Sequence, residues 1–427
     1  MASTSSQDLV ERAIRALPGG TIGNVPMSKD HPVIIREGRG SKVYDVDGRE
    51  YLDYMIGSGP MILGHAHPAV VEAVQRQMAR GSTFFITNEL AIELAEEIVR
   101  AVPCAEQVRY VSSGTEATFY ALRIARAYRK RDKILKFEGG YHGMHDYAIM
   151  SLSPTKLSPF PTPVANSAGV PKAVQDTVLV APFNDLDYAT ELIEQNHDDL
   201  AAVIVEPLQR VIEPMPGFLQ GLRKVTQQYE IPLIFDEIVT GFRFAYGGAQ
   251  EYYGVEPDIA AIGKIVGGGF PLAGVVGKRD IMHSFDPEME GTDEYVPQVG
   301  TLNGNPIAAA AGLATLEVLR QPGAYERLFA TGRQLMGGLE QLLREAEIPA
   351  KVSGEAPMFD VYFTEEEIVD YRATMRADST MHKKFVSSLV DQGILRAGHK
   401  FYVSLAHDQQ DVDRTLDAFK QAIDIIR

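Results

Sequence analysis

The feature that most constrains the fold is an alternation of short apolar segments with helical segments that begins near residue 108. The helix expected after the segment 201–205 shows this well, because Leu219, Leu222, Val225 and Tyr229 recur at three- and four-residue spacing. Strands that alternate with helices form mainly parallel sheets with helices on both faces. We therefore predict an α/β fold. The expected strands are 108–111, 134–137, 177–180, 201–205, 232–235 and 258–262.

The two ends of the chain show a different pattern. Residues 33–54 resemble a small antiparallel meander with a hairpin turn at Asp47-Gly48. Past Pro306, helices are expected at 308–319, 324–346 and 379–391, and short strands at 358–363 and 401–405. This pattern predicts a second, smaller α+β domain. The predicted division is 1–60 as an N-terminal segment packing with the small domain, 61–315 as the large domain and 316–427 as the small domain.

Composition excludes several classes of function. The 427 residues carry a net charge of −16, which repels nucleic acid and anionic lipid, so we expect neither as a partner. The single cysteine, Cys104, can form no intramolecular disulfide and no cysteine-based metal cage, and we predict no metal site. The polar start of the chain, Met1 to Gln7, lacks the apolar core of a signal peptide, so we expect a cytoplasmic protein.

The one long apolar run, residues 259–277, contains a single charge, Lys264. Six glycines and Pro271 make the run a poor membrane helix, so it predicts a strand, a loop and a strand. A lysine in an apolar place is paired, neutralised or used chemically, and a strand-end lysine beside flexible glycines suits a Schiff base. Taken alone, Lys264 could also be a lysine that extends from a loop end to solvent.

Two nucleotide-binding motifs that such a run suggests are absent. A P-loop would need a glycine five residues before Gly263 and a Ser or Thr at Ile265. A dinucleotide-binding Gly-x-Gly-x-x-Gly does not occur at any expected strand end. These absences set aside a nicotinamide-dependent dehydrogenase.

A carboxylate pair, Asp236-Glu237, follows the apolar strand 232–235 directly. Ligands bind at the carboxyl ends of strands in open α/β sheets, and a carboxylate there can keep a pyridine nitrogen protonated. The alternative is a helix N-cap or an ion pair with the nearby Arg243.

Three further loops have the composition of ligand-binding turns. Residues 112–116 join a strand to a helix and present two hydroxyls and a glycine, which suits a phosphate, although a simple capping box has the same pattern. Residues 139–143 place an aromatic side chain, Tyr141, near the same crevice, whereas His142 there is more often structural. Residues 300–306 form a second small polar turn. Together with Lys264 and Asp236, these loops are the set that binds pyridoxal 5′-phosphate (PLP).

On these motifs, the chain resembles the class III aminotransferases of fold type I, closest to the branch around glutamate-1-semialdehyde 2,1-aminomutase. The resemblance covers roughly residues 17–422. Its most specific parts are 235–243 and Gly263-Lys264. The other matching segments are 46–48, 63–65, 67–68, 113–117, 141–143, 205–207 and 300–306.

The resemblance implies a mainly parallel seven-stranded sheet in the large domain and a homodimer with shared active sites. It implies that Lys264 forms a Schiff base with PLP and moves a proton, that Asp236 pairs with the ring nitrogen, and that Tyr141 and Ile238 lie on opposite ring faces. The implied cofactor contacts are Ser113, Gly114, Thr115, Tyr141, His142, Glu206, Gln209, Asp236, Ile238, Lys264 and, from the neighbouring subunit, Thr301.

The chain departs from the aminomutases where substrate would bind. They carry a tryptophan in the loop equivalent to 57–60, where this chain has Ser58, and an arginine after the Gly-Gly turn, where residues 21–27 hold no basic residue. The segment 394–405 also lacks their acidic residue. We therefore predict transamination. If the substrate has a carboxylate, Arg210 is the first candidate to bind it, followed by Arg396 and Lys400.

The predicted reaction moves an amino group between an amino acid or amine, with α- and β-amino acids favoured, and an oxo acid by a ping-pong mechanism. An aminomutase or an amino-acid epimerase on the same scaffold is the nearest alternative. A PLP fold that serves as a non-catalytic sensor is the remote one.

Overall fold

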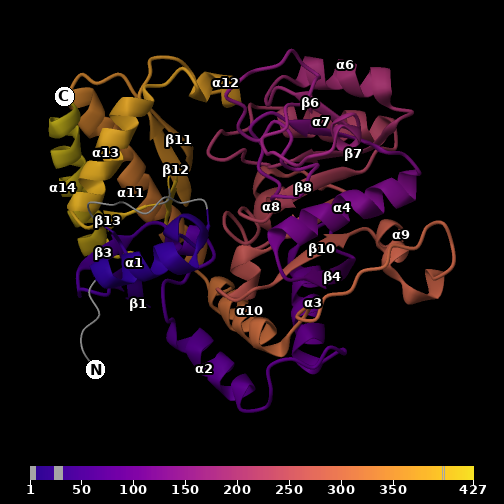
Figure 1. The fold of residues 1–427 in the computed structure, drawn as a ribbon, viewed down its shortest axis with the longest axis horizontal. Coiled ribbons are helices and arrows are strands. Elements are labelled where there is room, and N and C mark those ends of the chain that lie inside the picture. Colours follow the sequence, from indigo (N-terminus) through magenta and orange to yellow (C-terminus); the bar gives the residue numbers. More distant parts are fainter. Residues whose placement is uncertain (1–5, 24–31, 397, 399) are drawn as a thin grey trace.

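A seven-stranded sheet organises the centre of the computed structural model, which describes residues 6–23, 32–396, 398 and 400–427. All its strands are parallel except β10, which runs antiparallel to its neighbours β9 and β4. In spatial order the strands are β4 (Gln107–Val111), β10 (Ala273–Gly277), β9 (Ile259–Ile262), β8 (Leu233–Glu237), β7 (Leu200–Val205), β5 (Lys133–Phe137) and β6 (Val178–Ala181). The predicted α/β fold with a mainly parallel seven-stranded sheet is confirmed (Figure 1).

Helices cover both faces of this sheet because its strands are apolar on both sides. Leu135, Val203 and Phe235 pack into one core with the apolar stripe of α7 (Phe218–Gln228). Their neighbours Ile134, Ala202 and Ile204 pack into a second core with α4 (Gly114–Arg129). Alternate residues of one strand therefore face different helices, as the pleat requires.

The apolar run around Lys264 forms β9, a 3₁₀ turn η3 (Lys264–Gly267) and β10, as predicted. Helix α10 (Pro306–Leu319) packs against this turn and against α2 (Pro68–Met78) and α3 (Glu89–Ala101). The remaining helices around the large sheet are α5 (Lys172–Gln175), α6 (Leu186–Asn196), α8 (Gly248–Tyr253) and α9 (Arg279–Met282), and the remaining 3₁₀ turns of the chain are η1 (Pro18–Gly20), η2 (Ile56–Ser58), η4 (His283–Phe285) and η5 (Pro287–Met289).

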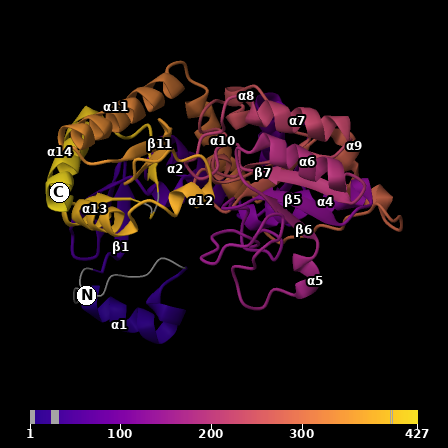
Figure 2. The ribbon, with the colours of Figure 1, turned by 90° about the horizontal axis from the view of Figure 1, so that it is seen from above.

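Two smaller sheets lie beside the large one (Figures 1 and 2). The first contains β1 (Ile35–Arg39), β2 (Lys42–Asp45), β3 (Glu50–Asp53) and β13 (Ile394–Leu395), and the second contains β11 (Lys351–Glu355), β12 (Met358–Tyr362) and β14 (Phe401–Tyr402). The helices of this part are α1 (Ser6–Ala16), α11 (Ala324–Glu345), α12 (Tyr371–Thr374), α13 (Ser379–Asp391) and α14 (Gln409–Ile426).

The N-terminal meander and the C-terminal third of the chain share a sheet. Strand β3 pairs in parallel with β13, with Leu52 opposite Ile394, and Ser41 Oγ donates to Asp411 Oδ2 over 2.7 Å. The domain division stays a prediction. The predicted boundary after residue 315 lies inside α10, which continues to Leu319.

Among the described residues, no helix combines the length and apolar character that a membrane crossing needs. The same part of the chain holds no group of three or more His, Cys, Asp and Glu side chains arranged to hold a metal ion. Cys104 is a buried free thiol.

Candidate functional site

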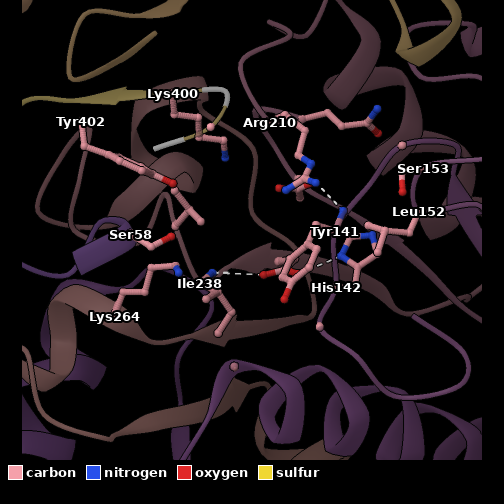
Figure 3. Close-up of a pocket in the computed structure, with 18 of the residues that line it drawn as sticks. Ser58, Tyr141, His142, Leu152, Ser153, Arg210, Ile238, Lys264, Lys400 and Tyr402 are labelled. Atoms are coloured by element: carbon pink, nitrogen blue, oxygen red, sulfur yellow. Dashed lines mark hydrogen bonds and ion pairs between the residues drawn. The ribbon is translucent and has the colours of Figure 1, made fainter. Parts of the chain in front are cut away.

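A cavity of about 920 Å³ opens at the carboxyl ends of the parallel strands (Figure 3). Turns that follow four strands line it: those after β4, β5, β7 and β9, with the end of β8 between them. The predicted site residues that line this cavity are Ser58, Ser113, Gly114, Thr115, Tyr141, His142, Glu206, Gln209, Arg210, Asp236, Ile238, Lys264 and Lys400. The residues from 113 to 264 meet there because parallel strands end at one edge of the sheet, whereas Ser58 and Lys400 reach the cavity from the part of the chain around the two smaller sheets.

Lys264 begins the turn η3 in the left-handed region, with φ +50°. Its Nζ has no hydrogen-bond or ion-pair partner among the residues that the structure describes. Burial lowers the pKa of Lys264, and the positive charges of Lys400 and Arg243 lower it further. A lysine amine with a lowered pKa is more often neutral, which is the form that attacks a carbonyl carbon.

Asp236 lies near the end of β8 and is buried. Its Oδ2 pairs with His142 Nδ1 over 2.7 Å, and its Oδ1 accepts from the backbone N–H of Ile238 over 3.1 Å. Burial raises the pKa of Asp236 to about 7 and lowers the pKa of His142 to about 3. A carboxylate held this way still lacks a cation, because a neutral imidazole supplies only a hydrogen bond.

The two alternatives for the Asp236-Glu237 pair have different outcomes: Glu237 accepts from N–H groups at the start of a helix, as one of them predicts, whereas the ion pair with Arg243 is absent among the described residues. Glu237 is buried and accepts from Gln250 Nε2 over 2.9 Å and from the backbone N–H of Ala249. Arg243 pairs with neither carboxylate, since its Nε donates to Val239 O over 2.9 Å and its Nη2 donates to Gly59 O. Glu237 therefore holds the start of α8, and Asp236 alone faces the cavity.

Tyr141 and Ile238 both line the cavity, and Tyr141 is 38% exposed to it and to solvent. Glu206 fixes the Tyr141 backbone, because the Tyr141 N–H donates to Glu206 Oε2 over 2.7 Å. Arg210 lies with its guanidinium carbon 5.0 Å from the centre of the Tyr141 ring. The Tyr141 ring, the Ile238 side chain and the Asp236 carboxylate are placed to hold a flat aromatic ring.

The turn after β4 leads into α4, with Ser113 as the N-cap. Ser113 Oγ accepts from the Glu116 N–H over 3.2 Å, so the capping pattern is present. A side chain at Gly114 would contact Ile238 at 3.0 Å, and one at Gly143 would come within 2.6 Å of Thr115 Oγ1. Glycines at these positions let backbone segments approach closely at the start of the 16-residue helix α4. The first N–H groups of a helix have no partner within it and can bind a phosphate.

The side-chain oxygen of Gln209 tests whether an aromatic ring with an oxygen substituent fits the cavity. Gln209 is buried and its Nε2 donates to Glu138 O over 2.9 Å, but its Oε1 has no partner among the described residues. His142 Nε2 is likewise buried without one. Buried polar atoms are nearly always satisfied, so these atoms point to a polar ligand. The residues present fit PLP: a lysine, a ring-nitrogen carboxylate, an aromatic face, an oxygen contact and a phosphate turn.

Two predicted residues are not brought to the cavity. Thr301 is exposed and does not line it, as expected if it serves the neighbouring subunit. Arg396 is buried in the C-terminal part, where its Nη2 donates to Asp360 Oδ2 over 2.8 Å. The candidate role of Arg396 in binding substrate is therefore corrected: its charge is neutralised by Asp360, away from the cavity.

Sequence reasoning missed three residues that shape the site. Lys136 is fully buried in β5 and donates to the carbonyls of Gly140, Ala148 and Met150, which holds the loop that carries Tyr141. Arg243 is fully buried behind Lys264, and Tyr402 lines the cavity beside it. A lysine inside the apolar run Ile134 to Phe137 was the available signal for Lys136.

Comparison with known proteins agrees with this geometry. The class III aminotransferase family model matches residues 25–423. A glutamate-1-semialdehyde 2,1-aminomutase of Methanothermobacter thermautotrophicus is 42% identical over 98% of both chains. An omega-transaminase of Sphaerobacter thermophilus of known structure is 39% identical, with a TM-score of 0.94 over 100% of this chain and 98% of the other. A glutamate-1-semialdehyde-aminomutase structure from Pseudomonas aeruginosa is 26% identical, with a TM-score of 0.88 over 99% of this chain and 94% of the other.

The match covers the residues that line the cavity and nearly the whole fold. The chain therefore belongs to the class III aminotransferase family, and its cofactor is pyridoxal 5′-phosphate.

Proposed function

We propose that this enzyme is an aminotransferase that moves an amino group from an amino acid or amine to an oxo acid in two half-reactions. The observation that carries the proposal is the substrate side of the cavity, where Ser58 stands in place of the tryptophan expected of an aminomutase. Among the solved structures, similarity to the omega-transaminase is higher in identity and in TM-score than similarity to the aminomutase, which supports the same reaction.

When bound, PLP supplies an aldehyde for Schiff-base formation and a ring that withdraws electrons. Lys264 Nζ, whose pKa burial lowers, would be the nucleophile toward that aldehyde. After substrate displaces it, the same Nζ would take the proton from the substrate carbon that bears the amino group and deliver it to the cofactor carbon that carried the aldehyde. Asp236, positioned by His142 and the Ile238 N–H, would hold a proton at the ring nitrogen.

A homodimer belongs to the same proposal. Exposed apolar side chains gather near Thr301: Val299 and Leu302 beside it, and the segment Phe84 to Ile86. Asn88 Nδ2 donates to Gly304 O over 2.8 Å, which ties the start of α3 to the 300–304 turn. Apolar groups of this kind on one surface favour a protein interface. We infer that a second copy covers them and that its Thr301 reaches this subunit's phosphate turn.

Sedimentation of the holoenzyme tests the homodimer. We expect twice the mass of the 46.9 kDa chain. Ile86→Asp should shift the protein toward monomer and weaken PLP binding, whereas a monomeric wild type that retains PLP and full activity would contradict it.

The second candidate is the aminomutase reaction, and the curated relatives favour it. The relative described above bears that name at 42% identity over the full length. An aminomutase moves the amino group within a single substrate, so the two candidates differ in whether turnover needs an acceptor.

The discriminating experiment gives the holoenzyme one amino donor at a time without an acceptor. For an aminotransferase we expect the Schiff-base absorbance to disappear in a single stoichiometric step, with turnover only after an oxo acid such as pyruvate or 2-oxoglutarate is added. Sustained conversion of glutamate-1-semialdehyde without an acceptor, together with no half-reaction for any α-amino, β-amino or carboxylate-free donor, would establish the aminomutase instead.

A further inference from the structure

Two cations on the cavity wall have no carboxylate partner. Arg210 follows β7 in the large sheet's part of the chain, and Lys400 precedes β14 in the C-terminal part. No side-chain carboxylate lies within ion-pair distance of either among the described residues. In Figure 3 both side chains enter the cavity from the side opposite Lys264 and Ile238.

Lys400 is the more unusual of the two, since it is only 7% exposed. Its Nζ has no hydrogen-bond partner in the described part of the chain, and the nearest aromatic ring, Tyr402, has its centre 5.8 Å away. Burial, together with the positive charge of Arg210, lowers the pKa of Lys400 to about 7. A buried ammonium without a partner is costly, so a site that retains one gains from an anion that arrives with the ligand.

Arg210 adds a second, independent cation. Its backbone lies in the left-handed region, with φ +62°, which turns its side chain over the Tyr141 ring. Glu206, four residues earlier, does not compensate it, because its carboxylate accepts from the Tyr141 N–H and lies outside ion-pair distance of Arg210. The planar guanidinium can bind a carboxylate through two parallel hydrogen bonds.

Side chains that can carry a positive charge outnumber those that can carry a negative one in the cavity, although the chain as a whole is acidic. Four of the first kind line the cavity (Arg210, Lys264, Lys383 and Lys400) against three of the second (Glu206, Asp236 and Asp378), in a protein with net charge −16. Lys264 and Asp236 are committed to the cofactor, and Asp378 caps α13 by accepting from the N–H groups of Thr380 and Met381. The remaining cations are therefore left for substrate.

We propose that Arg210 and Lys400 together bind a carboxylate of the substrate, so that the enzyme acts on amino acids and oxo acids in preference to simple amines. The proposal rests on the proposed aminotransferase function and names its substrate class. Because the two cations come from the parts of the chain around different sheets, a bound carboxylate would link those parts across the cavity.

The test compares matched donors that differ only in the carboxylate: alanine with 2-aminopropane, and 3-aminobutanoate with 2-aminobutane. For wild-type holoenzyme we expect kcat/KM at least about 10-fold higher for the carboxylate member of one pair. Arg210→Gln and Lys400→Met should each reduce that preference about 10-fold, through KM, and the double variant should remove it. Arg210→Lys should recover part of it. In each variant the preference is the ratio of kcat/KM for the two members of a pair, so that a change in the chemistry common to both donors cancels.

A binding measurement separates this proposal from the reaction type. Acetate and succinate, titrated into holoenzyme, should perturb the cofactor absorbance, with dissociation constants that rise about 10-fold in Arg210→Gln and in Lys400→Met. Lys384→Met, which removes an exposed cation of α13 that does not line the cavity, is the matched control and should change neither measurement. The proposal would be overturned if the double variant kept both the carboxylate preference and the binding of acetate. If no donor gave a half-reaction but acetate still bound to the wild-type holoenzyme, only the proposed aminotransferase function would be overturned.

Discussion

Two lysines of the large sheet, one in β5 and one directly after β9, show how differently one residue type can be used. Lys136, inside β5, is fully buried and donates to three backbone carbonyls, with 3.1 Å to Gly140 O and 2.9 Å to Ala148 O. Lys264, directly after β9, faces the cavity and has no partner among the residues described. Burial lowers the pKa of both amines. The difference lies in the acceptors around them, and acceptors, more than burial, separate a structural lysine from a reactive one.

The comparison predicts a reciprocal pattern. Loss of Lys264 should abolish chemistry and leave stability unchanged, whereas loss of Lys136 should reduce stability first. A result in which both substitutions had the same effect would break the distinction.

Lys264→Ala is the change with the largest expected effect. It removes the amine that we propose forms the Schiff base and moves the proton, so kcat should fall by about 10⁴-fold, near the upper limit for one general acid and base. The free energy of unfolding of the apoenzyme should not fall, because the lost amine has no hydrogen bond in the described structure. Steady-state kinetics and urea unfolding measure the two effects. Activity within 10-fold of wild type would refute the assignment of Lys264.

Asp236→Asn has the next largest expected effect. The amide keeps the shape and can still bond to His142, but it carries no charge to hold a proton at the ring nitrogen. We expect kcat to fall by about 10²–10³-fold, comparable to the loss of one electrostatic contact to a transition state. The cofactor absorbance should shift while PLP stays bound.

Glu237→Gln is the control for Asp236→Asn, since Glu237 is the adjacent carboxylate but holds the start of α8. Its effect should appear in stability and leave the absorbance unchanged. An absorbance shift equal to that of Asp236→Asn would place the ring-nitrogen contact in doubt.

Much of this site could be predicted from sequence because parallel strands end at one edge. Asp236 lies at the end of one apolar strand and Lys264 just after another, and these strands are parallel neighbours, so the two side chains reach the same edge of the sheet. The partners of Lys136 could not be predicted, because they are carbonyls of a loop, 138–150, whose path no periodicity describes. Arg396 and Lys400 are four residues apart, and only the position of Asp360 on β12 shows that the first is neutralised and the second is not.

Lys136→Met tests the structural member of the pair. The thioether fills part of the space but leaves three carbonyls without their donor, so the apoenzyme should lose about 3 kcal/mol of unfolding free energy. Lys133→Met, in the same strand, removes a lysine at the surface that pairs with Asp199 over 2.8 Å, and its effect should be much smaller. Equal losses in urea unfolding would mean that the three carbonyl contacts contribute nothing specific.

The smallest expected effect is a difference between wild type and Lys136→Met in how the free energy of unfolding depends on pH. This difference bears most directly on the comparison of Lys136 with Lys264. Burial lowers the pKa of Lys136 to about 7, below its ordinary 10.5, so above about pH 7 the unfolded chain binds a proton that the folded chain lacks, and the neutral amine then donates to only two of the three carbonyls. Stability of the apoenzyme should therefore rise with pH from about 7 to 8.5, by at most about 1.4 kcal/mol per pH unit for this one group. In Lys136→Met that contribution should vanish, and Lys133→Met should retain it. If the unfolding free energies of wild type and Lys136→Met change equally with pH, the three carbonyls keep Lys136 charged throughout this range. The Lys136 amine would then differ from that of Lys264 in protonation as well as in contacts.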